Sequence, residues 1–475
     1  MLNTMAFVNR KRELAALDEW WQRPGPQLGV IWGRRRIGKS YLIGHWARDK
    51  RAIFHIARNQ PVREQLRQLS ERASPLASSA DRDLTRTPFS DWDDLFLVLA
   101  NAARDEPLLL VIDEFAELHQ AEPNIESTLR AIWEGVTADS KLRVLLTGSA
   151  VRAMEALQAE RAPLFGRATL RLHLRPFTPG ESALMLRGLP PAERAKAWGV
   201  CGGTPYYLDL WDDGAPFRAN LERLVCTQQG ILLNEGELVL ATEDFAGGHR
   251  ERIPEQVLRA IATSHTSFSE IKAAISADPT RALRALQDLD LISRIQPVRS
   301  KPDARRAVYR ITDNFLGFWL SLVEPFREYI VWGIGADVAE IIEDGFADFM
   351  GPRWEEAFRR HLVTVALADP RLRPVAGIGE FWKAGTRGDG DGDQCELDAV
   401  ILTGRERVVS LVGEAKWGVS ANGGRLLRGL ERKAIESGLP LADDLVYALC
   451  AREEITNLPN DRDDVIVVTA AEIFG

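Results

Sequence analysis

The first third of the chain alternates short apolar runs with helical patterns. The runs are Leu28–Trp32, Ile53–Ala57, Leu108–Ile112, Val144–Thr147 and Leu170–Leu174. Between them, apolar residues recur three or four positions apart, as they do in helices that cover a sheet. Buried strands separated by such helices are typical of a parallel sheet with helices on both faces. The pattern therefore predicts an α/β domain over residues 1–177.

The middle of the chain has a mainly helical pattern. Residues 178–250 are predicted to form a small helical lid, interrupted at Gly202-Gly203-Thr204-Pro205. Three further helices are predicted, and two strands follow them around a charged turn through Arg306. Three helices and a hairpin are the arrangement of a winged helix, which we expect over residues 251–313. The predicted helices are Pro254–Ala262, Phe268–Ile275 and Thr280–Leu289, and the strands are Leu291–Val298 and Ala307–Ile311.

The last part of the chain returns to a mixed pattern. An aromatic helix, Asn314–Tyr329, is predicted as a rigid connector over residues 314–335, and a second, smaller α/β domain is expected over residues 336–475. Its predicted helices are Phe346–Ala368 and one after Gly424. Its predicted strands are Gly379–Lys383, Glu396–Thr403, Val408–Ala415, Leu445–Ala451 and Val465–Thr469.

The stretch Gly385–Gln394 is rich in Asp and Gly and resembles a calcium loop only in composition. Gln394 and Val400 stand where an EF-hand needs its glycine and its bidentate glutamate. We therefore predict a solvated hairpin loop.

Composition narrows the class of protein. The chain has 475 residues, of which 45% are hydrophobic and 27% charged, so several globular cores are expected. No apolar run approaches the length of a membrane span, and the four cysteines are far apart with no CxxC pair. A soluble, cytoplasmic protein without a zinc site is expected. Because the net charge is -8, any contact with DNA must come from a local basic patch.

A phosphate-binding loop follows the first predicted strand. Its eight residues are Gly33, Arg34, Arg35, Arg36, Ile37, Gly38, Lys39 and Ser40, which spell GxxxxGKS. The two glycines let backbone N–H groups turn towards phosphate oxygens, and the helix that starts near Lys39 directs its positive end to the same place. We expect Lys39 to reach the β- and γ-phosphates and Ser40 to hold Mg²⁺. The alternative is a glycine turn without a ligand.

Polar residues end two other strands of the predicted sheet. Asp113 and Glu114 follow the third run, where Asp113 is expected to bind Mg²⁺ through water and Glu114 to polarise the attacking water. Thr147 or Ser149 is expected to sense the γ-phosphate, although both residue types also serve as plain strand-end caps. Arg167 is a candidate for stabilising charge on the transferred phosphoryl group, or it is a surface arginine. The absence of an NKxD motif favours ATP over GTP.

A second group of chemical residues lies near the C-terminus. Asp398 is central in one predicted strand, and the next strand carries Glu414 and Lys416, which share a face because strand side chains alternate. Strands lie about 4.8 Å apart, so the two carboxylates can converge on Mg²⁺ while the lysine orients a hydrolytic water. The alternative is a polar strand pair on a solvated face.

The predicted winged helix is locally basic. Residues 253–312 hold ten basic and six acidic residues, a surplus of four, and Arg281 and Arg284 lie on its predicted recognition helix. This module is predicted either to bind DNA or to act as a protein–protein spacer.

Taken together, the motifs resemble the archaeal-type ATPase family, relatives of the STAND and Orc/Cdc6-like ATPases. The matching segments span residues 7–210 in order: Phe7-Val8-Asn9-Arg10 with Glu13-Leu14, GRRRIGKS, LLLVIDEF, LLTGSA, PLFGR, LRPF and GGTPYYL. The resemblance implies ATP binding, with Val8 and Arg10 beside the adenine and the loop that ends at Pro205 closing over the nucleotide.

Members of this family often carry a C-terminal domain related to PD-(D/E)xK nucleases, and this implies a further carboxylate at Glu355, with Glu356 the near alternative. The expected fold is therefore a P-loop NTPase parallel sheet with a helical lid, then a winged helix, then a small α/β domain resembling restriction endonucleases. The expected protein is an ATP-driven regulator, using ATP and Mg²⁺, joined to a DNA-directed, metal-dependent nuclease-like module. The alternative is a non-cleaving ATP switch that binds DNA or a protein partner.

Overall fold

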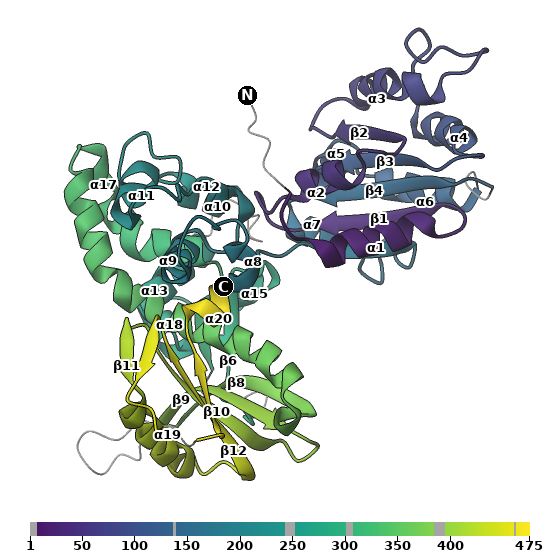
Figure 1. Ribbon diagram of the computed structural model, residues 1–475. Helices are drawn as coiled ribbons and strands as arrows, with labels where there is room; N and C mark the ends of the chain where they lie inside the picture. Colours follow the sequence, from purple (N-terminus) through teal and green to yellow (C-terminus); the bar gives the residue numbers. More distant parts are fainter. Residues whose placement is uncertain (1–6, 136–138, 243–251, 301–306, 384–394, 460–461) are drawn as a thin grey trace. The chain divides into compact units, whose positions relative to one another are not determined.

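The computed structural model describes residues 7–135, 139–242, 252–300, 307–383, 395–459 and 462–475 (Figure 1). The predicted loop at residues 385–394 and the predicted turn through Arg306 lie outside these ranges. The chain forms two compact units, Met1–Pro176 and Phe177–Gly475. No helix within the described ranges is long and apolar enough to cross a membrane.

The first unit is built on a five-stranded parallel sheet. Its strands are β1 (Gln27–Trp32), β2 (Ala52–Ile56), β3 (Leu108–Asp113), β4 (Leu142–Gly148) and β5 (Ala168–His173), in the order β2-β3-β4-β1-β5. The parallel pairing confirms the predicted α/β fold. Because parallel strands end at one edge of a sheet, the residues that follow β1, β3 and β4 meet there.

Helices cover both faces of this sheet. They are α1 (Lys11–Gln22), α2 (Lys39–Trp46), α3 (Val62–Ala77), α4 (Trp92–Ala102), α5 (Phe115–Ala121), α6 (Ile125–Gly135) and α7 (Val151–Ala156). Successive residues of β1 point to opposite sides: Val30 packs in the core beneath α3 and α4, whereas Ile31 packs with Leu17 and Leu42 of α1 and α2. Strands buried on both sides explain the unbroken apolar runs.

The second unit begins with short helices, as predicted for the lid segment. These are α8 (Pro179–Ala183), α9 (Pro191–Cys201), α10 (Pro205–Asp209), α11 (Phe217–Leu224) and α12 (Glu235–Thr242). Three more follow, α13 (Ile253–Ala262), α14 (Phe268–Ile275) and α15 (Thr280–Asp288), with an antiparallel pair, β6 (Ile292–Ile295) and β7 (Val308–Ile311). The three helices lie within a residue of their predicted positions, while the strands are shorter than predicted.

The prediction of one continuous aromatic helix was wrong. The segment instead consists of α16 (Asn314–Phe318), a π-helical turn at Trp319–Val323, a 3₁₀ turn at Glu324–Phe326 and α17 (Arg327–Val331). Pro325 has no backbone N–H to continue the helical ladder, which accounts for the break at this point. The next helix, α18 (Gly335–Ala368), begins well before the predicted start at Phe346.

The last part of the chain forms a mixed five-stranded sheet in the order β14-β12-β10-β9-β8. Its strands are β8 (Val375–Lys383), β9 (Cys395–Thr403), β10 (Val408–Lys416), β12 (Leu441–Ala451) and β14 (Val465–Val468). Pairing is antiparallel from β8 to β10 and parallel from β10 to β14. A short 3₁₀ turn (Pro370–Leu372), the pair β11 (Ser420–Asn422) and β13 (Glu454–Thr456), and α20 (Ala470–Phe474) complete the unit.

One helix packs on each face of this mixed sheet. Ala399 and Leu411 contact the core that contains Phe358 of α18, whereas Val400 and Val412 contact the core that contains Leu430 of α19 (Gly423–Ser437). Figure 1 shows α19 lying against β9 and β10. The helix begins after Asn422, whose side-chain oxygen accepts the backbone N–H of Arg425 at 2.9 Å. Side chains of β9 and β10 on the same sheet face as Val400 and Val412 therefore lie next to α19.

Candidate functional site

The loop between β1 and α2 has the backbone of a phosphate-binding loop. Gly33 has φ 155°, and a Cβ atom there would lie 2.3 Å from the carbonyl oxygen of Leu174. Gly38 has φ 90°, which side chains rarely tolerate. The Arg10 guanidinium donates to the carbonyl oxygens of Ile37 (3.2 Å) and Arg175 (3.0 Å), and so ties the loop to the segment after β5. Among the other loop residues, Ile37 is buried, Arg35 is exposed, and Arg34 and Arg36 are partly buried.

The side chains expected to bind nucleotide and Mg²⁺ meet at this edge of the sheet. Lys39 is 7% exposed, and its ammonium donates to the carbonyl oxygens of Gly33 (2.7 Å) and Arg34 (3.1 Å). The Ser40 hydroxyl donates to Oδ2 of Asp113 at 2.6 Å. A hydroxyl and a carboxylate oxygen are hard ligands of the kind that Mg²⁺ prefers. The loop and the end of β3 therefore offer the oxygen donors that the sequence predicted.

Glu114 is held by Ser149. Its backbone has φ 54°, in the left-handed region, and its carboxylate accepts the Ser149 backbone N–H at 3.1 Å and the Ser149 hydroxyl at 2.9 and 3.0 Å. Thr147, at the end of β4, is fully buried, and within the described residues its hydroxyl has no hydrogen-bond partner. Of the two predicted γ-phosphate sensors, Ser149 is thus engaged with Glu114 and Thr147 is unpaired.

Three other predicted nucleotide residues lie in different settings. Arg167 donates to the carbonyl oxygens of Pro163 and Phe165, both at 3.2 Å, within its own loop. Val8 is partly buried and precedes α1, and Pro205 is the first residue of α10 in the second unit.

An aromatic group beside the loop was not predicted. The Phe7 ring stacks on His45 with centroids 3.9 Å apart and lies 5.8 Å from the Tyr41 ring. Tyr41 is 47% exposed, and both Tyr41 and His45 lie on α2, which begins at the phosphate loop. Their spacing of four residues on a helix was the available sequence signal.

In the second unit, Asp398, Glu414 and Lys416 come together as the sequence predicted from strand alternation. The Lys416 ammonium lies 2.7 Å from Oε1 of Glu414. Asp398, on the neighbouring strand, accepts the backbone N–H of Ala415 through Oδ2 at 2.8 Å. A second lysine completes the group: Lys433 of α19 donates to Oε2 of Glu414 at 2.7 Å. Sequence reasoning missed Lys433 because only the packing of α19 on β10 brings it to Glu414.

Glu355 approaches the same group from α18. Arg359 lies 3.8 Å from Glu355 and donates to the carbonyl oxygen of Asp398 at 2.6 Å. Burial, and then the Asp398 charge, raise the pKa of Glu355 to about 7. Burial, and then the Glu414 charge, raise the pKa of Asp398 to about 6. The alternative carboxylate, Glu356, is instead paired with Arg360 at 2.7 Å.

The carboxylates form pairs and not a closed metal cage. Across the described residues, no three His, Cys, Asp or Glu side chains lie close enough together to hold a metal ion. Asp398 and Glu414 are near enough for each charge to disfavour the other, which is the situation that a divalent cation relieves. Their oxygens suit Mg²⁺, but each oxygen of Glu414 already contacts a lysine, so a metal ion would compete with two ammonium charges for this carboxylate.

The β6–β7 hairpin is joined to the mixed sheet. Arg310 of β7 binds Glu380 of β8 through two bonds of 2.8 and 2.9 Å, and Glu380 is 3% exposed. The N–H of Val298 donates to the carbonyl oxygen of Glu380 at 2.9 Å, and Arg299 donates to that of Glu406 at 2.9 Å. The hairpin and the sheet are therefore one connected structure.

Arg281 and Arg284 both lie exposed on α15, as predicted for one helix face. In the described part of the chain, neither guanidinium makes an ion pair or hydrogen bond.

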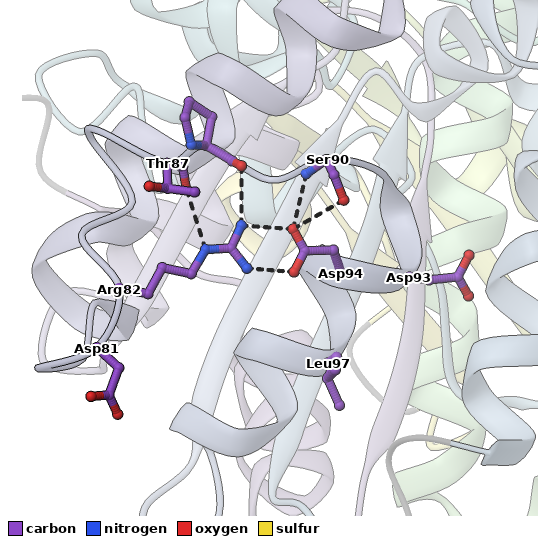
Figure 2. Close-up of a pocket in the computed structure, with 8 residues that line it drawn as sticks. Asp81, Arg82, Thr87, Ser90, Asp93, Asp94 and Leu97 are labelled. Carbon is purple, nitrogen blue, oxygen red and sulfur yellow. Dashed lines mark hydrogen bonds and ion pairs between the residues drawn. The ribbon is translucent and has the colours of Figure 1, made fainter.

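A pocket of about 580 Å³ is lined by none of these residues but by the loop that joins α3 to α4 and by α4 itself (Figure 2). Figure 2 shows Arg82 at its centre, bound to both oxygens of Asp94 at 2.5 and 2.7 Å and to the carbonyl oxygens of Thr87 and Pro88 at 3.3 and 3.0 Å. The guanidinium of Arg82 is already hydrogen-bonded within the loop. Among the residues that the structure describes, the pocket therefore has no free cation at its centre to bind a ligand.

A parallel sheet with a phosphate loop after β1 and paired carboxylates after β3 defines a P-loop ATPase domain. Residues 7–210 match a family described as ATPase domains predominantly from Archaea, and residues 319–425 match a family of archaeal and bacterial proteins of unknown function. The first part of the chain therefore matches this archaeal ATPase family, and the match to the second family follows it along the chain.

Two relatives from Methanocaldococcus jannaschii are similar in sequence. The uncharacterized protein MJECL04 is 25% identical over 418 residues, which cover 86% of this chain and 87% of that protein. The uncharacterized ATP-binding protein MJ0423 is 39% identical over 51 residues, 11% of this chain and 86% of that protein. Among solved structures, the Walker-type ATPase paby2304 of Pyrococcus abyssi is 19% identical with a TM-score of 0.51, covering 66% of this chain and 96% of that chain. This last likeness concerns the fold.

Proposed function

We propose that this protein is an ATP-driven regulator joined to a DNA-directed, metal-dependent nuclease-like site. The observation that carries the proposal is the group formed by Asp398, Glu414 and Lys416 on neighbouring strands, with Glu414 and Lys416 2.7 Å apart. Two carboxylates and a lysine are a suitable set for hydrolysis of a phosphodiester with the help of Mg²⁺. This use of the group is also what the resemblance to PD-(D/E)xK nucleases implies.

In the first unit, the residues of the phosphate loop bind ATP and Lys39 binds its β- and γ-phosphates. Ser40 and Asp113 hold Mg²⁺, which would neutralise phosphate charge, and their contact of 2.6 Å supports this pairing. Glu114 orients the attacking water once it has left Ser149. The Thr147 hydroxyl, buried and unpaired in the described structure, donates to the γ-phosphate.

The remaining nucleotide contacts are proposed from the family resemblance and from the aromatic group beside the loop. Val8 and Arg10 lie beside the adenine, and the aromatic group of Phe7, Tyr41 and His45 provides a flat surface for the base. Arg167 stabilises charge on the transferred group, and Pro205 belongs to the lid loop over the nucleotide.

In the second unit, Asp398 and Glu414 hold Mg²⁺ and Glu355 adds a further carboxylate. Lys416 orients the hydrolytic water. In this proposal residues 251–313 form a winged helix, preceded by a lid at 178–250 and followed by a connector at 314–335 and the nuclease-like domain at 336–475. The exposed Arg281 and Arg284 of α15 contact DNA phosphates.

A second candidate function is a non-cleaving ATP switch that binds DNA or a protein partner. One observation favours it: Lys416 and Lys433 together occupy both carboxylate oxygens of Glu414. If these ion pairs persist in solution in the presence of Mg²⁺, the group is a structural ion-pair network.

Cleavage decides between the two functions. The full chain is incubated with supercoiled plasmid and Mg²⁺ or Mn²⁺, with and without ATP, beside Asp398→Ala. The matched control is Asp348→Ala, which removes an exposed carboxylate from α18. Nicking by the wild type and the control, but not by Asp398→Ala, supports the nuclease site. Intact plasmid under every condition leaves the non-cleaving switch.

The contact of α15 with DNA is tested separately. Replacing Arg281 and Arg284 with alanine should reduce the slope of log K against log salt by about 0.9 for each lost phosphate contact. Equal salt slopes in the wild type and the double variant would indicate that α13–α15 and the β6–β7 hairpin act as a protein–protein spacer.

A further inference from the structure

The outer face of α19 carries a cluster of arginines that the proposed catalysis does not use. Arg425, Arg428 and Arg432 are all exposed, and at 3.6 residues per turn they fall within an arc of about 60°. The opposite face, with Leu427 and Leu430, is buried against the sheet. This cluster, named here the α19 arginine face, is therefore fixed in position by the core beneath it.

Two of the three arginines of this face, Arg425 and Arg428, are not neutralised by the described residues around them. Gly423–Ser437 holds four basic and two acidic residues in a chain whose net charge is -8. Both acidic residues are engaged: Glu431 binds Arg462 at 2.9 Å and Glu436 lies 3.7 Å from Arg432. Within the described residues, the guanidinium groups of Arg425 and Arg428 make no ion pair and no hydrogen bond.

The same helix reaches the Asp398–Glu414 group. Lys433 is on the side of α19 that turns towards β10, and its ammonium lies 2.7 Å from Glu414. Arg425 precedes Lys433 by eight residues, which is about 12 Å along the helix axis at 1.5 Å per residue. A nucleic-acid strand rises about 3.4 Å per nucleotide, so this length corresponds to three or four phosphates.

We propose that the α19 arginine face binds the phosphate backbone of a nucleic acid, preferentially duplex DNA, and leads the strand to Lys433 and the Asp398–Glu414 group. Arg425 and Arg428 bind phosphates flanking the site, and Lys433 binds the phosphate that lies nearest Glu414. The inference rests on the proposed function, because it takes nucleic acid to be the substrate of that group. It adds the surface that delivers the substrate.

The surface is tested by the salt dependence of binding with the full chain and a labelled DNA duplex. Arg425→Ala/Arg428→Ala should lower the affinity and reduce the slope of log K against log salt by about 1.8, at 0.9 per contact, between about 50 and 200 mM salt. The matched control is Arg405→Ala, an exposed arginine in the turn at the other end of β9 and β10. Its slope should equal that of the wild type.

Lys433→Ala gives a second measurement and should also lower the affinity, whereas Lys433→Arg keeps a cation at the same place and should retain most of it. A salt slope for Arg425→Ala/Arg428→Ala equal to that of the wild type, in a protein that binds the duplex, overturns this inference and leaves the proposed function standing. Absence of binding by the wild type to both duplex and single-stranded DNA overturns both. Circular dichroism of each variant separates these outcomes from misfolding.

Discussion

Single carboxylates in both units are held by donors from the chain itself. Glu114 accepts the Ser149 hydroxyl and N–H, and Glu414 accepts two ammonium groups. Charge-assisted hydrogen bonds of this kind are about twice as strong as neutral ones. These donors therefore fix the orientation of each carboxylate, and at Glu414 a metal ion would compete with two ammonium charges.

At the proposed ATP site, substitutions of Lys39 and Glu114 are expected to impair different steps, ATP binding and ATP turnover. Lys39→Ala removes the ammonium that is proposed to pair with the phosphates, so ATP binding should be lost. Glu114→Gln should still bind ATP and turn it over at least about tenfold more slowly, a barrier increase of about 1.4 kcal/mol. Fluorescent nucleotide binding and phosphate release measure the two steps. Unchanged turnover in Glu114→Gln would remove this residue from its role.

At the C-terminal group, Lys433 competes with a metal ion for Glu414. Lys433→Gln should bind Mn²⁺ about tenfold more tightly, a change of about 1.4 kcal/mol, since one positive charge is removed from the site. Calorimetry is done without nucleotide on an Asp113→Asn background, so that the ATP site does not contribute. Lys383→Gln, an exposed lysine at the end of β8, is the control. Equal or weaker affinity in Lys433→Gln contradicts the competition.

The residues around Glu414 differ in how well their positions could be predicted from the sequence. Asp398, Glu414 and Lys416 could be predicted because strand alternation and neighbouring strands fix their relations within one hairpin. Lys433 could not, because its distance to Glu414 depends on how α19 packs against the sheet. Likewise, the contact between Glu114 and Ser149 depends on the rotamers of two residues on different strand ends.

At the scale of elements, the loop between α3 and α4 depends on one arginine. Arg82 binds Asp94, which lies in the first turn of α4, and this bond lowers the pKa of Asp94 from its ordinary value of 3.8. A carboxylate whose pKa is lowered in the folded state stabilises the fold at pH values above its ordinary, unfolded-state pKa. That contribution is lost as the pH falls through the lower value in the folded state.

Asp94→Asn should therefore destabilise the first unit by about 1.5–3 kcal/mol at neutral pH, the range for hydrogen bonds to charged groups. The difference from the wild type should shrink as the pH falls below about 4, where the wild-type carboxyl also becomes protonated. Urea unfolding across this range measures both effects. Asp93→Asn, in the same turn and outside this hydrogen-bond network (Figure 2), should be nearly neutral. A constant difference at all pH values would contradict the assigned cause.

Helices and strands were predicted with unequal success, for physical reasons. The strands of the first sheet could be read from the sequence because burial on both faces gives unbroken apolar runs, such as Leu108–Ile112. The segment Asn314–Tyr329 is also rich in apolar residues, but Pro325 interrupts it and it consists of short helical turns. Composition alone does not show where an apolar helix breaks.

The β6–β7 hairpin is attached to the mixed sheet by a largely buried ion pair. Arg310→Ala leaves Glu380, 3% exposed, with Arg359 at 3.7 Å as its remaining ion-pair partner among the described residues. The loss should destabilise the second unit by about 2–4 kcal/mol, near the lower end for buried pairs because Arg310 is 27% exposed.

Chemical denaturation measures this loss, and hydrogen exchange at Val298 should increase because its N–H donates to Glu380. The double variant Arg310→Met/Glu380→Gln removes both charges and should recover most of the stability. A double variant as unstable as the single one would show that packing, and not charge, holds the hairpin.

At the scale of the whole molecule, the chain has two units with separate hydrophobic cores. A ligand that binds only the folded first unit stabilises that unit by about 2.7 kcal/mol at one hundred times its Kd. Calorimetry with a non-hydrolysable ATP analogue and Mg²⁺ should therefore raise one unfolding transition by about 5–10 °C and leave the other in place. The control, Lys39→Ala, should abolish the increase. Equal shifts of both transitions would contradict separate unfolding.

The attachment of the β6–β7 hairpin to β8 affects the length of ligand that the protein can contact. Arg281 and Arg284 on one side, and Lys433 on the other, belong to elements joined through Glu380 and the mixed sheet. The ion pair and the backbone hydrogen bond at Glu380 limit how far these two contact points can move apart. A polymer bound at both points would therefore be protected over a length that depends on this attachment, and Arg310→Ala should make that length less well defined.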